Sequence, residues 1–109
     1  YLPTSQDKFL APVLRVLESC PSDNTPLSVW AQRVYTTERT LSRRCQNELG
    51  MSFSEWRQRL RFLHALPLLE QGKTVQEVAL EVGYSSSSAF IVMFQQISGT
   101  TPERYRKVS

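Results

Sequence analysis

Residues 27–50 read LSVWAQRVYTTERTLSRRCQNELG, and this stretch decides the fold. The hydroxyl of Thr37 can accept a hydrogen bond from the free amides of a following helical turn, so we expect a helix to begin there. Gly50 readily adopts the left-handed conformation that ends a helix. Between these residues, Leu41 and Cys45 lie four positions apart and share one apolar helix face. The stretch therefore predicts a short helix, a turn and a second, capped helix.

The same layout occurs a second time further along the chain. The positions that define it recur at an offset of 48 before the turn and 49 after it, and the pairs are Ala31 and Ala79, Val34 and Val82, Thr36 and Tyr84, Thr37 and Ser86, Leu41 and Phe90, Cys45 and Phe94, and Gly50 and Gly99. The small alanine of each half allows its two helices to cross closely. Two helices joined in this way form a helix-turn-helix unit, so the repeat predicts two such units in tandem.

Helix signals dominate the remaining sequence and strand signals are weak, so we predict an all-α fold of about seven helices. Residues 1–51 are expected to form the first helix-turn-helix subdomain, 52–72 a linker helix and 73–109 the second subdomain. A first helix is predicted over about 7–19, with Pro12 near its first turns.

The linker helix is expected to begin at a capping box formed by Ser52 and Glu55 and to run over about 53–71. Pro67 is unfavourable in that position, because a proline inside a helix removes a backbone hydrogen bond at a cost on the order of 3 kcal/mol. We therefore expect either a kink near residues 63–67 or an early end of the helix.

Three further helix starts follow the linker. Thr74 and Glu77 have the spacing of a second capping box. Either Ser85 or Ser86 is expected to cap the next helix, and Thr101 to cap a last short one. These starts complete the predicted second subdomain.

Charge is distributed unevenly along the chain, whose formal net charge is +3. Residues 33–61 carry seven arginines and three glutamates, whereas residues 74–99 carry two glutamates and no lysine or arginine. A basic first half suits binding to phosphate. The alternative is a solvated arginine-rich helix surface. No apolar run is long enough to cross a bilayer, so we expect no membrane partner.

The cysteines Cys20 and Cys45 do not form a disulfide framework. Each lies in an apolar stretch, so we interpret both as buried packing residues of a protein in a reducing compartment, the cytoplasm. Together with His64 they lack the spacing of metal ligands, and we expect neither a metal nor a cofactor. The start of the chain shows no signal peptide, and the absence of an initiating methionine suggests a fragment.

Four segments together resemble the AraC/XylS family of transcription regulators. They are residues 37–44 (TERTLSRR), 49–56 (LGMSFSEW), 83–90 (GYSSSSAF) and 99–105 (GTTPERY), and the similarity covers most of the chain. The resemblance implies a seven-helix fold with two subdomains and a role in transcriptional control. It also implies an N-terminal regulatory domain that this sequence does not include.

Base-reading residues are expected on the outward face of the helix that begins at Thr37. The positions that contact bases in the family fall on Arg39, Ser42 and Arg43. Arg39 and Arg43 lie four residues apart on one face, and arginine bound through two hydrogen bonds to guanine is the commonest specific major-groove contact. The alternative is that these arginines bind phosphate or pair with Glu38 and Glu48.

The second unit departs from the family at the corresponding positions, which are Ser87, Ser88, Ala89 and Val92. Arginine is common in relatives where this chain has Val92. Serine has no strong base preference, and Ala89 and Val92 offer only apolar contact, for instance to a thymine methyl. We therefore expect the first unit to dominate base readout. Alternatively, Ile91 and Val92 are partly buried or touch another domain.

Phosphate contacts are expected at helix N-termini, whose free amides and positive dipole end suit an anion. The candidates are Thr37, Ser52, Phe53, Ser86, Thr100 and Thr101. Arg44 and Arg57 are expected to add positive charge. Arg61 could do the same, or it could brace the two subdomains through an acidic partner.

Double-stranded DNA is thus the expected partner. A protein-interaction module that contacts RNA polymerase or another regulator through the acidic, partly apolar second unit is the rival interpretation. It does not exclude DNA binding by the first unit. We expect no enzyme, because the sequence shows no nucleophile–base pair, phosphate-binding loop or paired carboxylates.

Overall fold

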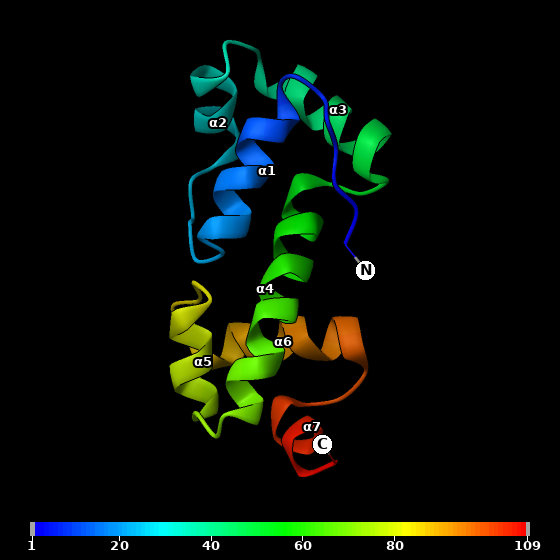
Figure 1. The fold of residues 1–109 in the computed structure, drawn as a ribbon. Helices are drawn as coiled ribbons and strands as arrows, with labels where there is room; N and C mark the ends of the chain where they lie inside the picture. The colour runs from blue at the N-terminus through cyan, green and yellow to red at the C-terminus, as the bar shows by residue number, and fades with distance from the viewer. Residues whose placement is uncertain (1, 109) are drawn as a thin grey trace. The chain divides into compact units, whose positions relative to one another are not determined.

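The computed structural model describes residues 2–108, which form seven α-helices and no strand (Figure 1). The helices are α1 (Leu10–Ser19), α2 (Leu27–Arg33), α3 (Glu38–Leu49), α4 (Phe53–Glu70), α5 (Val75–Glu81), α6 (Ser87–Ser98) and α7 (Pro102–Val108). The predicted all-α, seven-helix fold is therefore confirmed. The chain divides into two compact units, residues 1–57 and 58–109, so that the division falls within α4. No helix in the described part of the chain is both long enough and apolar enough to cross a membrane.

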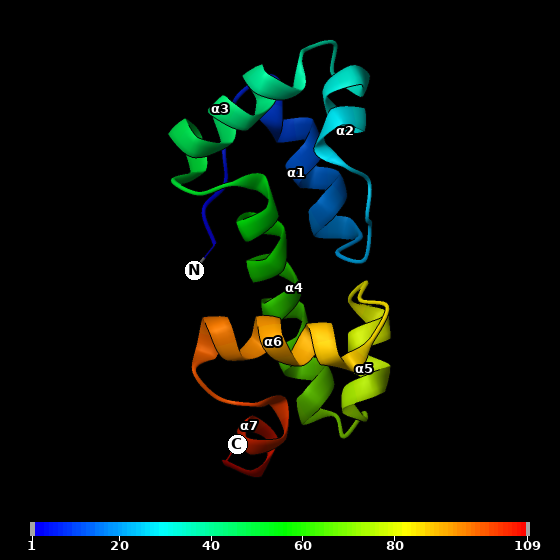
Figure 2. The same cartoon turned by 180° about the vertical axis from the view of Figure 1, so that it is seen from behind.

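The first unit contains α1, α2, α3 and the first turn of α4. Helix α1 lies beside both α2 and α3, as the two opposite views show (Figures 1 and 2). Buried apolar side chains of all four helices form its interior: Leu10, Val13, Leu14, Leu17, Trp30, Ala31, Leu41, Cys45, Leu49, Phe53 and Trp56. Ala31, which is buried, is the small residue of the helix-turn-helix pair.

Helix α1 begins three residues later than predicted, at Leu10 rather than Asp7. The physical reason is a capping contact, in which the Oδ2 atom of Asp7 accepts hydrogen bonds from the amides of Phe9 at 3.0 Å and Leu10 at 3.2 Å. Asp7 therefore satisfies the free amides of the helix from outside it. Pro12 is the third residue of α1, where its missing N–H would have had no partner within the helix.

The predicted caps of the two second helices are confirmed. Thr37 Oγ1 accepts from the amide of Thr40 at 3.1 Å at the start of α3, and Ser86 Oγ accepts from the amide of Ala89 at 3.4 Å at the start of α6. Gly50 ends α3 with φ +74°. The cap of α6 is thus Ser86, which decides between the two serines proposed for that position.

The two helix-turn-helix turns have the same backbone hydrogen bond. The amide of Thr36 donates to the carbonyl of Ala31, and the amide of Tyr84 donates to that of Ala79, both at 2.9 Å. The residue before each amide donor has a positive φ, and it is Tyr35 in the first unit and Gly83 in the second. The repeat found in the sequence is therefore a repeat of backbone geometry.

The second unit is built around the aromatic residues of α6. Phe90 and Phe94 are fully buried, as predicted, and they pack with Ala65, Leu69, Val78, Ala79, Val82 and Met93. Helix α5 begins at the predicted capping box. Thr74 Oγ1 accepts from the amide of Glu77 at 3.1 Å, and Glu77 Oε1 accepts from the amide of Thr74 at 2.9 Å.

Pro67 lies inside α4 without ending it, so the predicted early end is wrong. The helix continues to Glu70, and the amide of Gln71 still donates to the carbonyl of Pro67 at 3.0 Å. Leu69, two residues further on, is fully buried in the core of the second unit. Burial of this apolar face supplies a tertiary reason for the helix to continue past the proline.

The interpretation of both cysteines as packing residues holds for only one of them. Cys45 is fully buried in α3, whereas Cys20 is exposed at the end of α1. Cys20 lies outside the apolar stripe of α1, and its Sγ atom is 3.6 Å from Ser22 Oγ. Burial raises the pKa of the Cys45 thiol to about 11, with the negative charge of Asp7 adding to the shift.

Candidate nucleic-acid interface

Helix α3 presents three different faces. Leu41, Cys45 and Leu49 lie in the core, and Arg44 and Glu48 form a polar stripe next to it. Of the remaining positions only Thr40 is half-buried, and the exposed ones are Glu38, Arg39, Ser42, Arg43, Gln46 and Asn47. Since α-helices have 3.6 residues per turn, Arg39 and Arg43 fall on the side opposite the core. The structure thus brings the predicted base-reading residues of the first unit together on one open face.

The guanidinium groups of Arg39 and Arg43 have no hydrogen-bond or ion-pair partner within residues 2–108. The alternative pairing with Glu48 does not occur, because Glu48 Oε1 accepts instead from Ser5 Oγ at 2.8 Å. Glu38 forms no ion pair with either arginine in the described part of the chain. Both groups are therefore available to an external ligand rich in acceptors, such as the edge of a guanine or a phosphate.

Helix α6 offers a different surface at the corresponding positions. Ser88, Ala89 and Val92 are exposed, and Val92 has an exposed fraction of 55%. Ser87 and Ile91 are half-buried, so the alternative of partial burial applies to Ile91 but not to Val92. The exposed face of α6 within the described residues carries no charge, and it can form only hydroxyl, amide and apolar contacts.

Four of the five hydroxyl side chains predicted to anchor phosphate are engaged with their own helices. Besides Thr37 and Ser86, Ser52 Oγ accepts from the amide of Glu55 at 3.1 Å and Thr101 Oγ1 accepts from that of Arg104 at 3.2 Å. The amide of Thr100 donates to Ser98 Oγ at 3.3 Å. Phosphate contacts at these ends therefore fall to backbone amides that the caps leave free.

Phe53 supports only part of the role predicted for it. It is the first residue of α4, and its side chain is 5% exposed within the first unit. The ring is a packing residue, and only its backbone amide could face a phosphate.

The side chains of Arg44, Arg57 and Arg61 each have a partner inside the protein. Arg44 Nη1 lies 2.5 Å from Asp7 Oδ1. Arg57 Nη1 donates to the carbonyl of Thr25 at 2.8 Å, and its guanidinium lies 4.7 Å from the centre of the Phe53 ring. Arg61 is 6% exposed and packs over the ring of Tyr84. The geometry supports structural roles for these three arginines.

The contact made by Arg57 recurs in the second unit. Arg106 Nη2 donates to the carbonyl of Lys73, the residue before the N-cap of α5, just as Thr25 precedes the N-cap of α2. Arg57 and Arg106 are related by the offset of 49, and Thr25 and Lys73 by the offset of 48. We call this arginine-to-carbonyl hydrogen bond the arginine clamp. The sequence repeat indicated it, but the sequence interpretation missed it.

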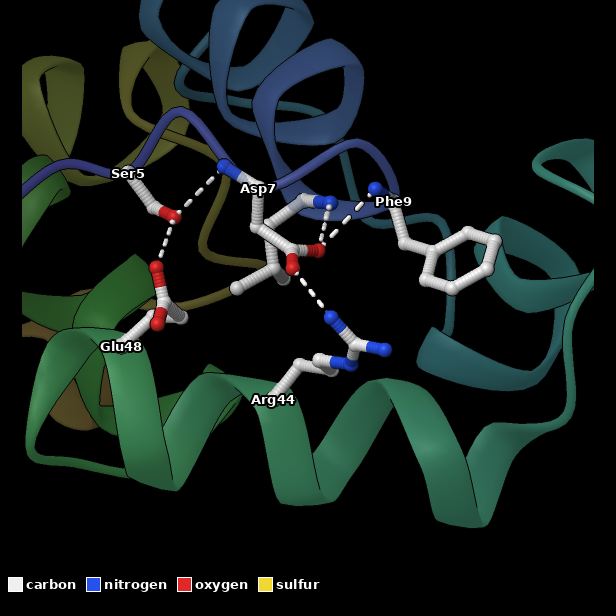
Figure 3. A network of polar contacts seen from close by, with 6 residues as sticks. Ser5, Asp7, Phe9, Arg44 and Glu48 are labelled. Atoms are coloured by element: carbon white, nitrogen blue, oxygen red, sulfur yellow. Dashed lines mark hydrogen bonds and ion pairs between the residues drawn. The ribbon is translucent and has the colours of Figure 1, made fainter.

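The residues before α1 form a second feature that the sequence interpretation missed. Ser5 Oγ donates to Glu48, Asp7 bonds to Arg44, and Trp56 Nε1 donates to the carbonyl of Pro3 at 2.7 Å. Figure 3 shows Ser5 and Asp7 directed toward the side chains that project from α3. These partners lie 37 to 53 residues apart in the chain, so no local pattern indicates them.

Comparison with known proteins agrees with this architecture. Residues 30–108 match the model of a helix-turn-helix domain family. The chain is 39% identical over 105 residues to the HTH-type transcriptional regulator NimR of Escherichia coli K12, covering 96% of this chain and 38% of that protein. It is 36% identical over 93 residues to the regulator RipA of Corynebacterium diphtheriae, covering 85% of this chain and 28% of that protein. The chain therefore spans well under half of the length of these relatives.

Solved structures show the same fold. The DNA-binding domain of AdpA, a global transcriptional factor solved in complex with a target DNA, superposes with a TM-score of 0.86 at 29% identity, covering 94% of this chain and 93% of that one. The C-terminal domain of AraT, a response regulator from Geobacillus stearothermophilus, has a TM-score of 0.89 at 23% identity over 97% and 89% of the two chains, which supports the fold alone.

Two tandem helix-turn-helix units, the first with two exposed arginines on its second helix, define a DNA-binding module of a transcription regulator. The chain belongs to the AraC family, as a DNA-binding domain of the helix-turn-helix type. Proteins of this family regulate transcription, and the relatives named above are regulators.

Proposed function

We propose that this domain binds a specific sequence of double-stranded DNA and that α3 dominates base readout. One observation carries the proposal: Arg39 and Arg43 are exposed on one face of α3 without a partner in residues 2–108, whereas Ser88 and Val92 occupy the same positions on α6. Each arginine bound through two hydrogen bonds to a guanine contributes about 1–3 kcal/mol of discrimination. The residues that match these two arginines on α6 offer no comparable contact.

In this proposal the second unit positions the domain and reads bases weakly. Ser87 and Ser88 supply hydroxyl groups with little base preference, and Ala89 and Val92 supply apolar contact that suits a thymine methyl. Ser42 assists on α3. The free backbone amides at the starts of α3, α4 and α6 hold the phosphates, with Thr37, Ser52 and Ser86 fixing these helix ends.

Selection of bound duplexes from a random pool, at stated salt concentration, tests the proposal. The wild-type chain should enrich one sequence family. The double variant R39A/R43A should lose at least about tenfold in affinity for the selected duplex, as the loss of two specific contacts requires. The matched control is R15A/K107A, which removes the same charge from two exposed positions. An R39A/R43A variant that binds the selected duplex like the control contradicts the assignment.

A further part of the proposal is that this domain works behind an N-terminal regulatory domain in a cytoplasmic transcription regulator without catalytic activity. The relatives are longer regulators, which supports the additional domain. RNA polymerase is a second proposed partner. Leu80 on α5 is 55% exposed and uncharged, which suits a protein contact better than a phosphate contact. In the full-length regulator, L80S should lower transcription from an occupied promoter without lowering promoter occupancy. A parallel fall in occupancy would contradict the polymerase contact.

A further inference from the structure

The segment of residues 3–7, called here the N-terminal arm, is hydrogen-bonded to α3 and to the start of α4. Pro3 accepts from Trp56 Nε1 at 2.7 Å, Ser5 donates to Glu48 at 2.8 Å, and Asp7 bonds to Arg44 at 2.5 Å. In both views of the ribbon the arm runs alongside α3 and the start of α4 (Figures 1 and 2). The arm is therefore part of the support of α3.

Asp7 is the centre of this support because it joins two helices. Its Oδ2 atom caps α1 through the amides of Phe9 and Leu10, while its Oδ1 atom meets Arg44 of α3 (Figure 3). The side chain of Asp7 is 8% exposed and that of Arg44 is 41% exposed, so water reaches the ion pair mainly from the side of the arginine. Ser5 adds to the network, since its Oγ atom accepts from the amide of Asp7 at 3.0 Å.

Arg44 and Glu48 occupy consecutive turns of α3, next to the core face and away from Arg39 and Arg43. Apolar packing of the core face permits small rotations of a helix about its axis, because dispersion contacts have no preferred direction. Charge-assisted hydrogen bonds do have direction, and two of them a turn apart fix the rotation. A rotation of about 10–20° would displace an arginine head from a bidentate contact, so such control matters for base readout.

Helix α6 lacks this polar support. The positions that match Arg44 and Glu48 at the offset of 49 are Met93, which is 3% exposed, and Ile97, which packs against the core of the second unit. Both positions are therefore apolar in α6. The directional support is confined to the helix that carries the two exposed arginines.

We propose that Asp7 is a positioning residue for base readout: by holding Arg44 it fixes the rotation of α3 and thus the direction in which Arg39 and Arg43 project. The inference rests on the proposed function of α3.

The test measures discrimination rather than affinity alone. Affinities of the 109-residue chain are measured for the duplex that the wild type selects and for a scrambled duplex of equal composition, and their ratio is compared between variants. D7N keeps a side-chain oxygen for the amides of Phe9 and Leu10 but removes the charge facing Arg44. E18Q, at an exposed position of α1, is the control with the same change in charge.

A second variant guards against a D7N protein that fails to fold. R44M places at this position the residue type that α6 has at Met93, and so it should keep α3 packed while removing the bond to Asp7. A mere loss of folded protein would lower both affinities equally and leave their ratio unchanged. We expect the ratio to fall about fivefold or more in D7N and R44M, and not in E18Q.

The outcomes separate this inference from the proposed function. If the wild type enriches a duplex, R39A/R43A loses it and D7N and R44M keep the wild-type ratio, then α3 reads bases and the positioning role of Asp7 is wrong. If the wild type enriches no duplex, the proposed function itself fails. A second selection with D7N should also show relaxed preference at the base positions that R39A/R43A no longer specifies, and an unchanged preference there would overturn the inference.

Discussion

Arg57 donates a hydrogen bond to the carbonyl oxygen of Thr25 at 2.8 Å, and this bond ties the first turn of α4 to the loop that precedes α2. The same guanidinium packs 4.7 Å from the centre of the Phe53 ring. The bond therefore holds α4, which follows the helix-turn-helix pair, against the loop where that pair begins. The hydrogen bond from Arg106 to the carbonyl of Lys73 is its counterpart in the second unit.

Replacement of Arg57 by alanine should destabilise the first unit by about 1.5–3 kcal/mol, the usual contribution of a hydrogen bond to a charged group. Both tryptophans of the chain, Trp30 and Trp56, lie in the first unit and are buried, so urea unfolding followed by tryptophan fluorescence reports on that unit. R15A is the control at an exposed site. A midpoint of R57A equal to that of R15A would show that the clamp contributes nothing.

Tyr35 should be replaceable by glycine with a gain in stability. Its φ is +62°, a conformation that costs a non-glycine residue roughly 1–2 kcal/mol, and its side chain is 94% exposed, so it contributes no packing. Glycine loses more entropy on folding, which leaves a net gain of about 0.5–1 kcal/mol. The urea midpoint of Y35G checks this. The reverse change G83A, where φ is +101°, should destabilise the protein, and a neutral G83A would count against the backbone argument.

The two cysteines should differ sharply in reactivity. Cys20 is exposed, whereas Cys45 is fully buried and burial raises its thiol pKa to about 11. At pH 8 a thiol reagent should therefore modify one cysteine quickly and the second only on unfolding, because the thiolate is the reactive form. Colorimetric titration with a disulfide reagent measures this. In C20S the fast phase should disappear, and its persistence would mean that Cys45 is accessible.

Acid should weaken the first unit partly through Asp7. Burial acts to raise the pKa of this carboxyl, but the amides of Phe9 and Leu10 and the guanidinium of Arg44 outweigh it and hold the pKa below the ordinary value of 3.8. A carboxyl with a lowered pKa stabilises the fold fully above its unfolded pKa and loses that effect as the pH falls through its folded pKa. The stability difference between wild type and D7N should therefore be constant above about pH 5 and shrink toward pH 3. If the stability difference between wild type and D7N does not shrink, the effect of Asp7 does not come from its charge.

The features that the sequence predicted correctly are local. Thr37, Ser86 and Gly50 act within one turn of a helix end, so their roles follow from residue type and spacing alone. The outward direction of Arg39 and Arg43 followed from the helical period, because Leu41 and Cys45 fixed the opposite face.

The features that the sequence did not predict depend on tertiary structure. Arg44 was expected to bind phosphate because nothing nearby in the sequence showed that Asp7, 37 residues earlier, would hold it. Pro67 was expected either to kink α4 or to end it early, and the early end does not occur because burial of neighbouring residues in the second unit favours the continuous helix. Cys20 was misassigned because it lies one residue beyond the end of α1, where the apolar stripe of that helix no longer buries it. The arginine clamp could have been found by extending the repeat to Arg57 and Arg106.

The central claim is that α3 specifies more bases than α6, and a paired comparison tests it most directly. At one stated salt concentration, the affinities of R39A/R43A and S88A/V92A are measured for the selected duplex and for its scrambled counterpart. The specific-to-scrambled ratio should fall at least about tenfold in R39A/R43A and less than about threefold in S88A/V92A. An equal fall in the two variants, or a larger one in S88A/V92A, would contradict the claim.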